Sequence, residues 1–249
     1  MKLLLAGESW MSYTTHVKGF DSFFTSTYNS GEKWLKKALE DGGWQVSYLP
    51  NHVAAEQFPF TMDEITKYDC VILSDIGSNT LLMSNDTFIR SVRKPNRCEL
   101  IRDYVQAGGS LVMIGGYLTF SGVDGKGRWG VTPVSDVLPV SMLEGDDRRE
   151  HPEGINPKVE TRHPAIANID GVWPALLGYN KTIAKPNTHV PVTINGDPLI
   201  AFGEFGKGKS AVFTSDCAPH WAPPEFCEWK QYPALWQGLI GYITDKMQV

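Results

Sequence analysis

The sequence predicts an α/β fold, a three-layer sandwich in which helices cover both faces of a mainly parallel central sheet. Continuous apolar runs at residues 70–73 and 111–114 are typical of strands that are buried on both faces. Segments with helical spacing of apolar side chains alternate with these runs, as expected for right-handed crossovers between parallel strands. A chain of 249 residues can bury such a core, and we expect residues 1–249 to form a single domain.

The first half of the chain is predicted to follow the order strand, helix, strand, helix, strand. Residues 2–6 form an apolar run that ends at glycine, and residues 44–49 and 70–73 supply the next two strands. Helices are expected after two capping-box patterns, which begin at Asn29 and at Thr61 and have a glutamate three residues later.

Later elements show weaker signals. Asn96 begins a third capping-box pattern, which predicts a helix that stops at Gly108. Residues 121–160 carry many glycines, prolines and charges, and we expect a long irregular excursion there. The other expected elements are a short helix near Val134–Leu138, an antiparallel hairpin over residues 198–215 with its turn at 206–209, and a final helix with Leu235, Leu239, Tyr242 and Ile243 on one face.

Composition and charge narrow the classes of partner. With 23 basic and 28 acidic side chains the formal charge is −5, which argues against a nucleic acid or an anionic membrane as partner. The apolar run at residues 3–6 is too short for a secretory signal, and no segment has the length of a membrane span. Four scattered cysteines form no disulfide framework, so we expect a cytoplasmic protein.

Two glycine-rich stretches match nucleotide-binding patterns only as strings of letters. Residues 203–210 satisfy the phosphate-loop pattern, but a β run follows them where a helix would have to begin. Residues 125–130 satisfy the dinucleotide pattern, but they also lead into no helix. The sequence therefore predicts a hairpin turn, a loop and no cofactor.

The best candidate for a functional site is the turn that follows the strand at residues 111–114. Gly115 and Gly116 permit a sharp turn there, and Tyr117 comes next. This pattern is typical of a nucleophile elbow, in which a side chain is presented at the carboxyl end of a parallel strand.

Several stretches, in the required order, resemble those of a putative glutamine amidotransferase-like family. They are the turn at residues 7–10, the turn at 73–79, the elbow at Tyr117 and the closing segment 206–236, whereas residues 121–195 are covered least. The resemblance implies a flavodoxin-like, class I glutamine amidotransferase-like fold. In that class the elbow holds a cysteine whose thiolate attacks the glutamine amide, and a later His-x-Glu supplies the base and its carboxylate.

The chain departs from this pattern at the elbow, because Tyr117 stands where the cysteine is expected. A phenol, with an ordinary pKa of about 10, is a weak nucleophile toward an amide, so we expect no glutaminase activity. Asp216 and His220 lie near the expected histidine and glutamate but without the His-x-Glu spacing. Cys217 is expected to be a small packed side chain and not a displaced nucleophile.

Candidate site residues share a position at the predicted carboxyl ends of different strands. Each alone has a structural explanation, such as helix capping by Glu8 or Asx turns at Asp75 and Asp216. Together they predict a pocket for a small polar molecule, and the scattered histidines predict no metal site. The expected ligand-binding residues are Glu8, Ser9, Asp75, Ser78, Asn79 and Tyr117, and the catalytic candidates are Tyr117, Asp216 and His220.

Two alternative functions remain open. The first is a hydrolase of unknown substrate, in which Asp216 or His220 activates water and Tyr117 donates a hydrogen bond to the developing oxyanion. The second is a homo-oligomeric assembly or scaffold protein that uses C-terminal aromatic residues as its interface, although packing under the last helix would explain the same residues. These aromatic residues are Trp221, Phe226, Trp229, Tyr232 and Trp236.

Overall fold

An eight-stranded sheet forms the centre of the computed structural model, which describes residues 1–246. Its order is β4-β1-β5-β6-β14-β13-β12-β9. Neighbours from β4 to β14 are parallel, and those from β14 to β9 are antiparallel. The strands are β1 (Lys2–Gly7), β4 (Gln45–Leu49), β5 (Cys70–Ser74), β6 (Ser110–Ile114), β9 (Lys158–Val159), β12 (His189–Ile194), β13 (Asp197–Phe205) and β14 (Gly208–Phe213).

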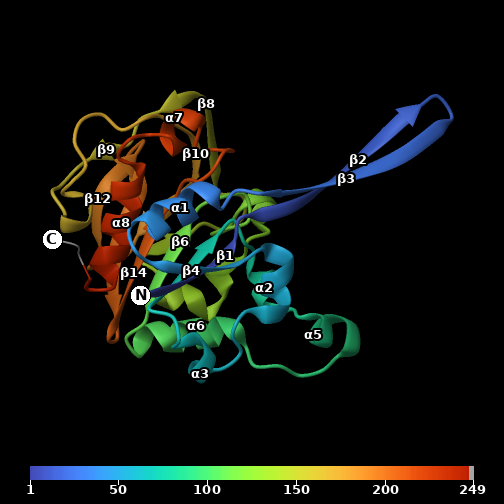
Figure 1. Ribbon diagram of the computed structural model, residues 1–249, viewed down its shortest axis with the longest axis horizontal. Coiled ribbons are helices and arrows are strands. Elements are labelled where there is room, and N and C mark those ends of the chain that lie inside the picture. The colour runs from blue at the N-terminus through green and yellow to red at the C-terminus, as the bar shows by residue number, and fades with distance from the viewer. Residues whose placement is uncertain (247–249) are drawn as a thin grey trace.

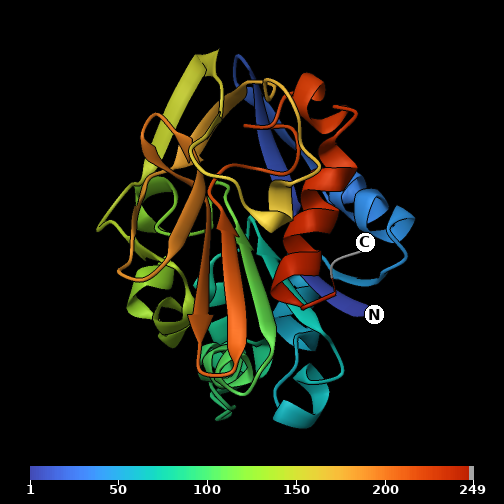
Figure 2. The same cartoon turned by 90° about the vertical axis from the view of Figure 1, so that its left-hand side faces the viewer.

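Helices cover both faces of this sheet, which confirms the predicted three-layer α/β architecture (Figure 1; Figure 2). One face carries α1 and α8, which pack against each other, and the other carries α2, α4 and α6. The helices are α1 (Lys33–Asp41), α2 (Asn51–Gln57), α3 (Met62–Ile65), α4 (Ser78–Leu82), α5 (Asn85–Arg90), α6 (Arg97–Gln106), α7 (Pro224–Cys227) and α8 (Tyr232–Ile243).

The apolar run of strand β1 is continuous because both of its faces are buried. Successive side chains of a strand point to opposite faces, so Leu3 and Leu5 join the core beneath α1 and α8. Leu4 and Ala6 join the second core, beneath α2 and α6. A strand between two covered faces has no solvent side, and this places the ends of β1, β5, β6 and β14, not their faces, within reach of a ligand.

Local capping signals were right for two of the three predicted helix starts. Thr61 and Glu64 form the expected capping box of α3, and the Asn96 side chain accepts hydrogen bonds from the first turn of α6. The prediction at Asn29 was wrong, because α1 begins at Lys33 and has no side-chain cap. Asn29 instead pairs with Trp10 in a ladder of strands that precedes the helix.

This ladder is an antiparallel hairpin that the sequence analysis did not predict. It consists of β2 (Ser9–Lys18) and β3 (Asp21–Ser30), and we call it the arm. The arm projects from the body as a two-stranded ribbon (Figure 1). It begins immediately after β1, so its base lies at the carboxyl edge of the central sheet.

Residues 121–195 contain more regular structure than expected. The 3₁₀ turn η3 (Pro133–Val137) matches the predicted short helix, but two small antiparallel sheets were missed. The hairpin of β13 and β14 is confirmed, and its turn accounts for the phosphate-loop string. The missed or additional elements are η1 (Val123–Gly125), η2 (Trp129–Val131), η4 (Pro164–Ile166), β7 (Val140–Met142), β8 (Arg148–Ile155), β10 (Leu176–Asn180) and β11 (Thr182–Ala184).

The C-terminal aromatic residues form core and not surface. Trp221, Phe226, Tyr232 and Trp236 are buried, and the rings of Phe226 and Trp236 pack near Phe213 of the central sheet. The chain itself already covers these four residues, which argues against an oligomer interface built from them, whereas Trp229 is only partly buried. Over residues 1–246, no helix combines the length and apolar character needed to cross a membrane.

Candidate functional site at the carboxyl ends of the strands

Three buried carboxyl groups lie at the carboxyl ends of neighbouring strands. Glu8 directly follows β1, Asp75 directly follows β5, and Asp216 comes three residues after β14. Glu8 and Asp75 both have left-handed backbone conformations, with φ of 49° and 40°. Such strained residues cost free energy and concentrate at functional sites, so the edge is a good candidate for one.

The three carboxyl groups oppose each other's ionisation. Burial, reinforced by Asp216 and Asp75, raises the pKa of Glu8 well above its ordinary value. Burial and Asp216 raise the pKa of Asp75 to about 6, and burial also raises the pKa of Asp216. Ser74 Oγ donates a 2.6 Å hydrogen bond to Glu8 Oε1. Burial and mutual repulsion therefore disfavour three full negative charges in this cluster.

His220 connects this cluster to the surface. Its Nδ1 lies 3.6 Å from Asp216 Oδ2, and this carboxyl group raises the pKa of His220. The imidazole is partly exposed, and its ring centroid lies 4.7 Å from that of Trp10 and 6.2 Å from that of Tyr117. An imidazole with a buried carboxyl group behind it and solvent in front can take up or release a proton near neutral pH.

The elbow after β6 has the sharp turn that the glycines predict. Gly116 has a φ of 153°, and a Cβ atom at this position would lie 2.7 Å from Asp75 Oδ1. Asp75 Oδ1 accepts a 2.8 Å hydrogen bond from the backbone N–H of Leu118. Asp75 thus holds the elbow through a long-range hydrogen bond, and not through the local Asx turn that was the structural alternative to ligand binding.

A second support holds the elbow from the other side. Asn180 Oδ1 accepts a hydrogen bond from the Gly116 N–H at 3.0 Å, and Asn180 Nδ2 donates to the Gly116 carbonyl oxygen at 3.1 Å. The same Nδ2 donates to Asp147, whose carboxylate also accepts from the N–H groups of Ser121 and Gly122. These buried bonds fix the backbone on both sides of Tyr117.

Tyr117 stands at the rim of the carboxyl edge and is 39% exposed. Its hydroxyl donates a 3.0 Å hydrogen bond to Glu150 Oε1, and the Arg148 guanidinium lies 4.8 Å from the ring centroid. Burial and Glu150 raise the pKa of Tyr117, so its phenol is a hydrogen-bond donor at neutral pH. Trp221 Nε1 donates to the other oxygen of Glu150, which fixes that acceptor.

Cys217 lies beneath the cluster and is buried. Its Sγ is 3.6 Å from Ser74 Oγ, and burial, with Glu8 and Asp216, raises its pKa well above the ordinary value. The ligand atoms of Glu8, Asp216 and Cys217 lie within 4.8 Å of one another. A metal bound to these groups would have to displace the protons whose retention burial favours.

The structure brings together five of the predicted residues: Glu8, Asp75, Tyr117, Asp216 and His220. The other three predicted residues have different surroundings. Ser9 Oγ accepts from the Asn51 N–H, Ser78 is buried at the start of α4, and Asn79 is exposed beside a hollow between α2 and α5.

Other residues of the site were missed, namely Trp10, Ser74, Asp147, Arg148, Glu150, Asn180 and Trp221. Four of these, from Asp147 to Asn180, belong to the stretch without sequence periodicity, where no motif identifies them. The position of Trp10 two residues after Glu8 was a signal that could have found it.

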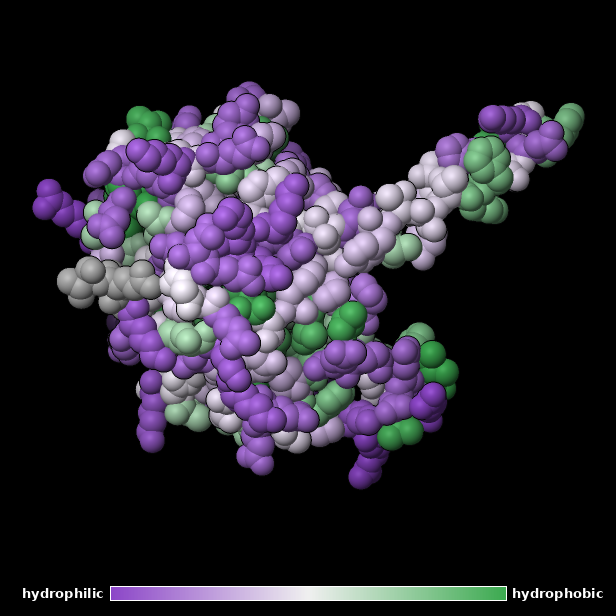
Figure 3. Space-filling model, viewed as in Figure 1, coloured by the Kyte–Doolittle hydropathy of each residue, from purple (hydrophilic) through white to green (hydrophobic). Residues whose placement is uncertain are grey.

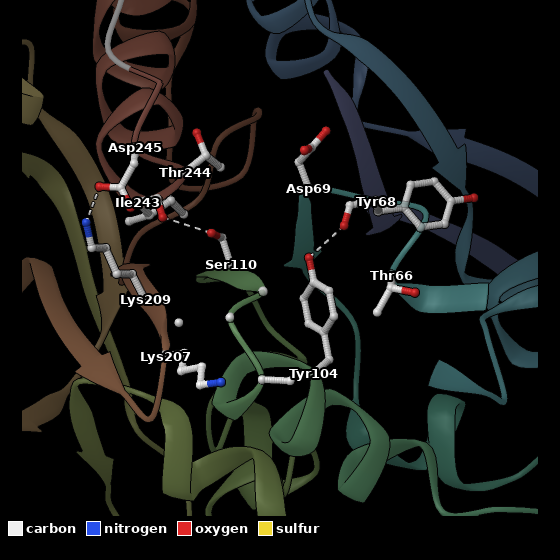
Figure 4. Close-up of a pocket in the computed structure, with 14 residues that line it drawn as sticks. Thr66, Tyr68, Asp69, Tyr104, Ser110, Lys207, Lys209, Ile243, Thr244 and Asp245 are labelled. Atoms are coloured by element: carbon white, nitrogen blue, oxygen red, sulfur yellow. Dashed lines mark hydrogen bonds and ion pairs between the residues drawn. The ribbon is translucent and has the colours of Figure 1, made fainter. Parts of the chain in front are cut away.

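A separate hollow of about 320 Å³ opens at the opposite, amino ends of β5, β6 and β14 (Figure 4). Tyr104 donates a hydrogen bond to the Tyr68 carbonyl oxygen there, and Ser110 donates to that of Ile243. These polar groups have partners within the chain, and none of the predicted site residues lines this hollow.

Comparison with known proteins identifies the family. The GATase1-like family model, described as "Putative glutamine amidotransferase", matches residues 2–245, and the chain belongs to this family. The solved structures of two cytoplasmic proteins from Salmonella typhimurium, STM3548 and STM1381 (the latter from strain LT2), are 45% and 44% identical to it. Their TM-scores are 0.95 and 0.94, and each comparison covers 98% of this chain and 99% of the relative.

A more distant solved structure, a ThuA-like protein from Parabacteroides merdae, is 14% identical with a TM-score of 0.60. The comparison covers 100% of this chain and 91% of the ThuA-like chain, and it shows a shared fold alone. Among curated proteins no significant match is found.

Proposed function

We propose that this protein is a glutamine amidotransferase-like domain without glutaminase activity that binds a small polar molecule at the carboxyl ends of its strands. The observation that supports this most directly is the side chain at the elbow. Tyr117 presents a protonated phenol to solvent at the position where amide hydrolysis would require a thiolate.

No other group in the cluster supplies the missing nucleophile. Cys217 is buried, and its raised pKa keeps it a thiol at neutral pH. Its neighbours Glu8 and Asp216 would repel the negative charge of a thiolate. A reaction that begins with thiolate attack on glutamine therefore has no suitable starting group in this site.

The rim suits binding of a molecule that is polar at its edges and apolar on one face. Trp10 and Tyr117 offer aromatic faces, and His220 lies between them with a partly exposed ring. The imidazole can donate a hydrogen bond to such a ligand, and the Tyr117 hydroxyl oxygen, whose proton goes to Glu150, can accept one. The two Salmonella relatives are named as cytoplasmic proteins, which supports a cytoplasmic location for this chain.

A ligand screen by calorimetry with Tyr117→Phe and His220→Gln tests the proposal. A ligand of this rim should bind the wild type and lose at least about tenfold in affinity in each variant, because each loses a polar contact. Asn79→Ala is the matched control, because Asn79 is exposed away from the rim. Release of ammonia from glutamine that disappears in Cys217→Ala would contradict the absence of glutaminase activity.

A second candidate, hydrolysis of another substrate, is favoured by one specific observation. The 3.6 Å approach of His220 Nδ1 to Asp216 Oδ2 orients the imidazole so that Nε2 is available as a general base for a water molecule. Tyr117 would then donate a hydrogen bond to the developing oxyanion, after its hydroxyl has turned away from Glu150 Oε1. A hydrolase screen in which His220→Gln turns over every substrate as fast as the wild type would exclude this candidate.

A further inference from the structure

The arm has one apolar and one polar face. Cross-strand partners in an antiparallel ladder point to the same side, and the register pairs Met11 with Tyr28 and Thr15 with Phe24. The apolar face carries Met11, Tyr13, Val17, Phe24 and Tyr28 together with the smaller Thr15, Ser22 and Ser26, and Phe20 lies at the turn. The polar face carries Ser12, Thr14, His16, Lys18, Asp21, Phe23, Thr25 and Thr27.

The apolar face of the arm is uncovered. Tyr13 and Phe24 are 77% and 75% exposed, and Phe20 at the tip is fully exposed. Figures 1 and 3 show the arm extending away from the body, so the chain's own core cannot cover this face. A two-stranded hairpin alone is marginally stable in water, and a sheet with one apolar face normally packs that face against another surface.

The same chain has a second uncovered apolar surface, which we call the α5 surface. It consists of Leu82, Met83, Phe88, Ile89 and Val92. Phe88 and Ile89 are 73% and 70% exposed, and a hollow of about 430 Å³ lies beside them between α2 and α5. Figure 3 shows apolar side chains in this region on the same side of the molecule from which the arm extends.

We propose that two copies of this chain form a two-fold dimer in which the arm of each covers the α5 surface of the other. A two-fold axis makes such a contact reciprocal, so every arm and every α5 surface is used. The arm is ten residues long in each strand, about 33 Å, which is enough to cross onto a second molecule.

The available area matches a stable dimer. Four aromatic side chains lie on the apolar face and the turn of the arm. If each buries about 100 Å², roughly half the area of a fully buried aromatic side chain, they contribute about 400 Å² per arm. Two arms and two receiving surfaces then bury about 1,600 Å² in total, which is the size of a standard specific interface.

Charge favours a second copy over a nucleic acid or an anionic membrane. The charged residues Lys18 and Asp21 are opposite each other in the strand register near the tip, and both point to the polar face. No charged residue of the arm lies on its apolar face. A membrane-binding element or a nucleic-acid arm would carry several lysines or arginines beside its contact face. Aromatic residues and methionine without charges are typical of the centre of a protein–protein interface.

Light scattering and sedimentation of adjacent variants test the arm directly. Phe24→Asp lies on the apolar face and should shift the protein to monomer, whereas Phe23→Asp lies on the polar face and should change the dimer affinity less than about threefold. Because Phe24 is 75% exposed, its substitution should leave the monomer's fold intact, and an unchanged circular dichroism spectrum is the check. A monomeric wild type, or a dimer unchanged by Phe24→Asp, would overturn the proposal.

Mixing two defective variants tests the pairing between arm and α5 surface. Phe24→Asp and Phe88→Asp should each be monomeric alone, yet their mixture should contain a heterodimer with one intact arm–surface contact. Pairing of arm with arm would instead leave Phe88→Asp dimeric, and failure of the mixture to associate would also overturn the proposal. Retention of the wild type on phosphatidylserine vesicles, abolished by Phe24→Asp, would assign the arm to a membrane and overturn it as well.

Discussion

Replacing Asp75 by Asn removes one ionisable group from the buried cluster while keeping the hydrogen bond that holds the elbow. Asn retains a side-chain oxygen that can accept from the Leu118 N–H. Burial and Asp216 raise the pKa of Asp75 from 3.8 to about 6. Because the folded state favours the protonated form, ionisation of Asp75 lowers the free energy of unfolding as the pH rises through this range.

The magnitude follows from the two pKa values. A rise from 3.8 to about 6 corresponds to at most about 3 kcal/mol, since one pKa unit is about 1.36 kcal/mol. The penalty is absent below about pH 4 and complete above about pH 7. For a chain of 249 residues this corresponds to about 6 °C in Tm.

Thermal unfolding of wild type and Asp75→Asn between pH 4 and pH 8 measures the effect. The Tm of the variant, relative to wild type, should increase as the pH rises from 4 to 7. Asp86→Asn is the control, because lysine and arginine partners lower the pKa of Asp86, so the removal of this carboxyl group should not stabilise the protein at neutral pH. A Tm difference between Asp75→Asn and wild type that stays constant with pH would refute the account in which burial and Asp216 raise the pKa of Asp75.

Two further substitutions test the supports of the site. Asn180→Ala removes both hydrogen bonds to Gly116 and should lower the free energy of unfolding by about 2–4 kcal/mol in urea titrations, while Asn79→Ala should change it by less than about 0.5 kcal/mol. Equal effects of Asn180→Ala and Asn79→Ala would contradict the role of Asn180 in holding the elbow. Gly31→Ala places a Cβ atom 2.5 Å from Glu8 Oε2 and should lower the free energy of unfolding by about 1–3 kcal/mol. Gly77→Ala is the control, because its Cβ atom would meet only ordinary contacts. An unchanged free energy of unfolding in Gly31→Ala would mean that Glu8 is not held rigidly.

Most of the central sheet could be predicted because its signals are local. Continuous apolar runs identified β1, β5 and β6, and the side chains of Thr61 and Asn96 marked helix starts. The arm could not be predicted in this way, because its apolar face packs on no core of this chain and its serines and threonines are typical of loops as well. Asn29 was assigned to a helix start because its local pattern was correct, but long-range strand pairing with Trp10 overrode it.

The candidate site was predictable in part for the same reason. Tyr117, Glu8 and Asp75 follow strands that the sequence marks clearly, so their meeting at one edge follows from parallel topology. Asn180 and Glu150 come from irregular segments and reach the elbow only through tertiary packing. No spacing in the sequence connects either residue with Gly116 or Tyr117.

The central claim is that the turn after β6 presents residue 117 to solvent while the native thiols stay covered. The most direct test is to treat the folded Tyr117→Cys variant and the folded wild type with iodoacetamide and to locate the adducts by mass spectrometry. The four native cysteines are buried, so the wild type should gain no adduct and the variant should gain one, at residue 117. An unmodified residue 117, or rapid modification of Cys217 in the wild type, would contradict this account.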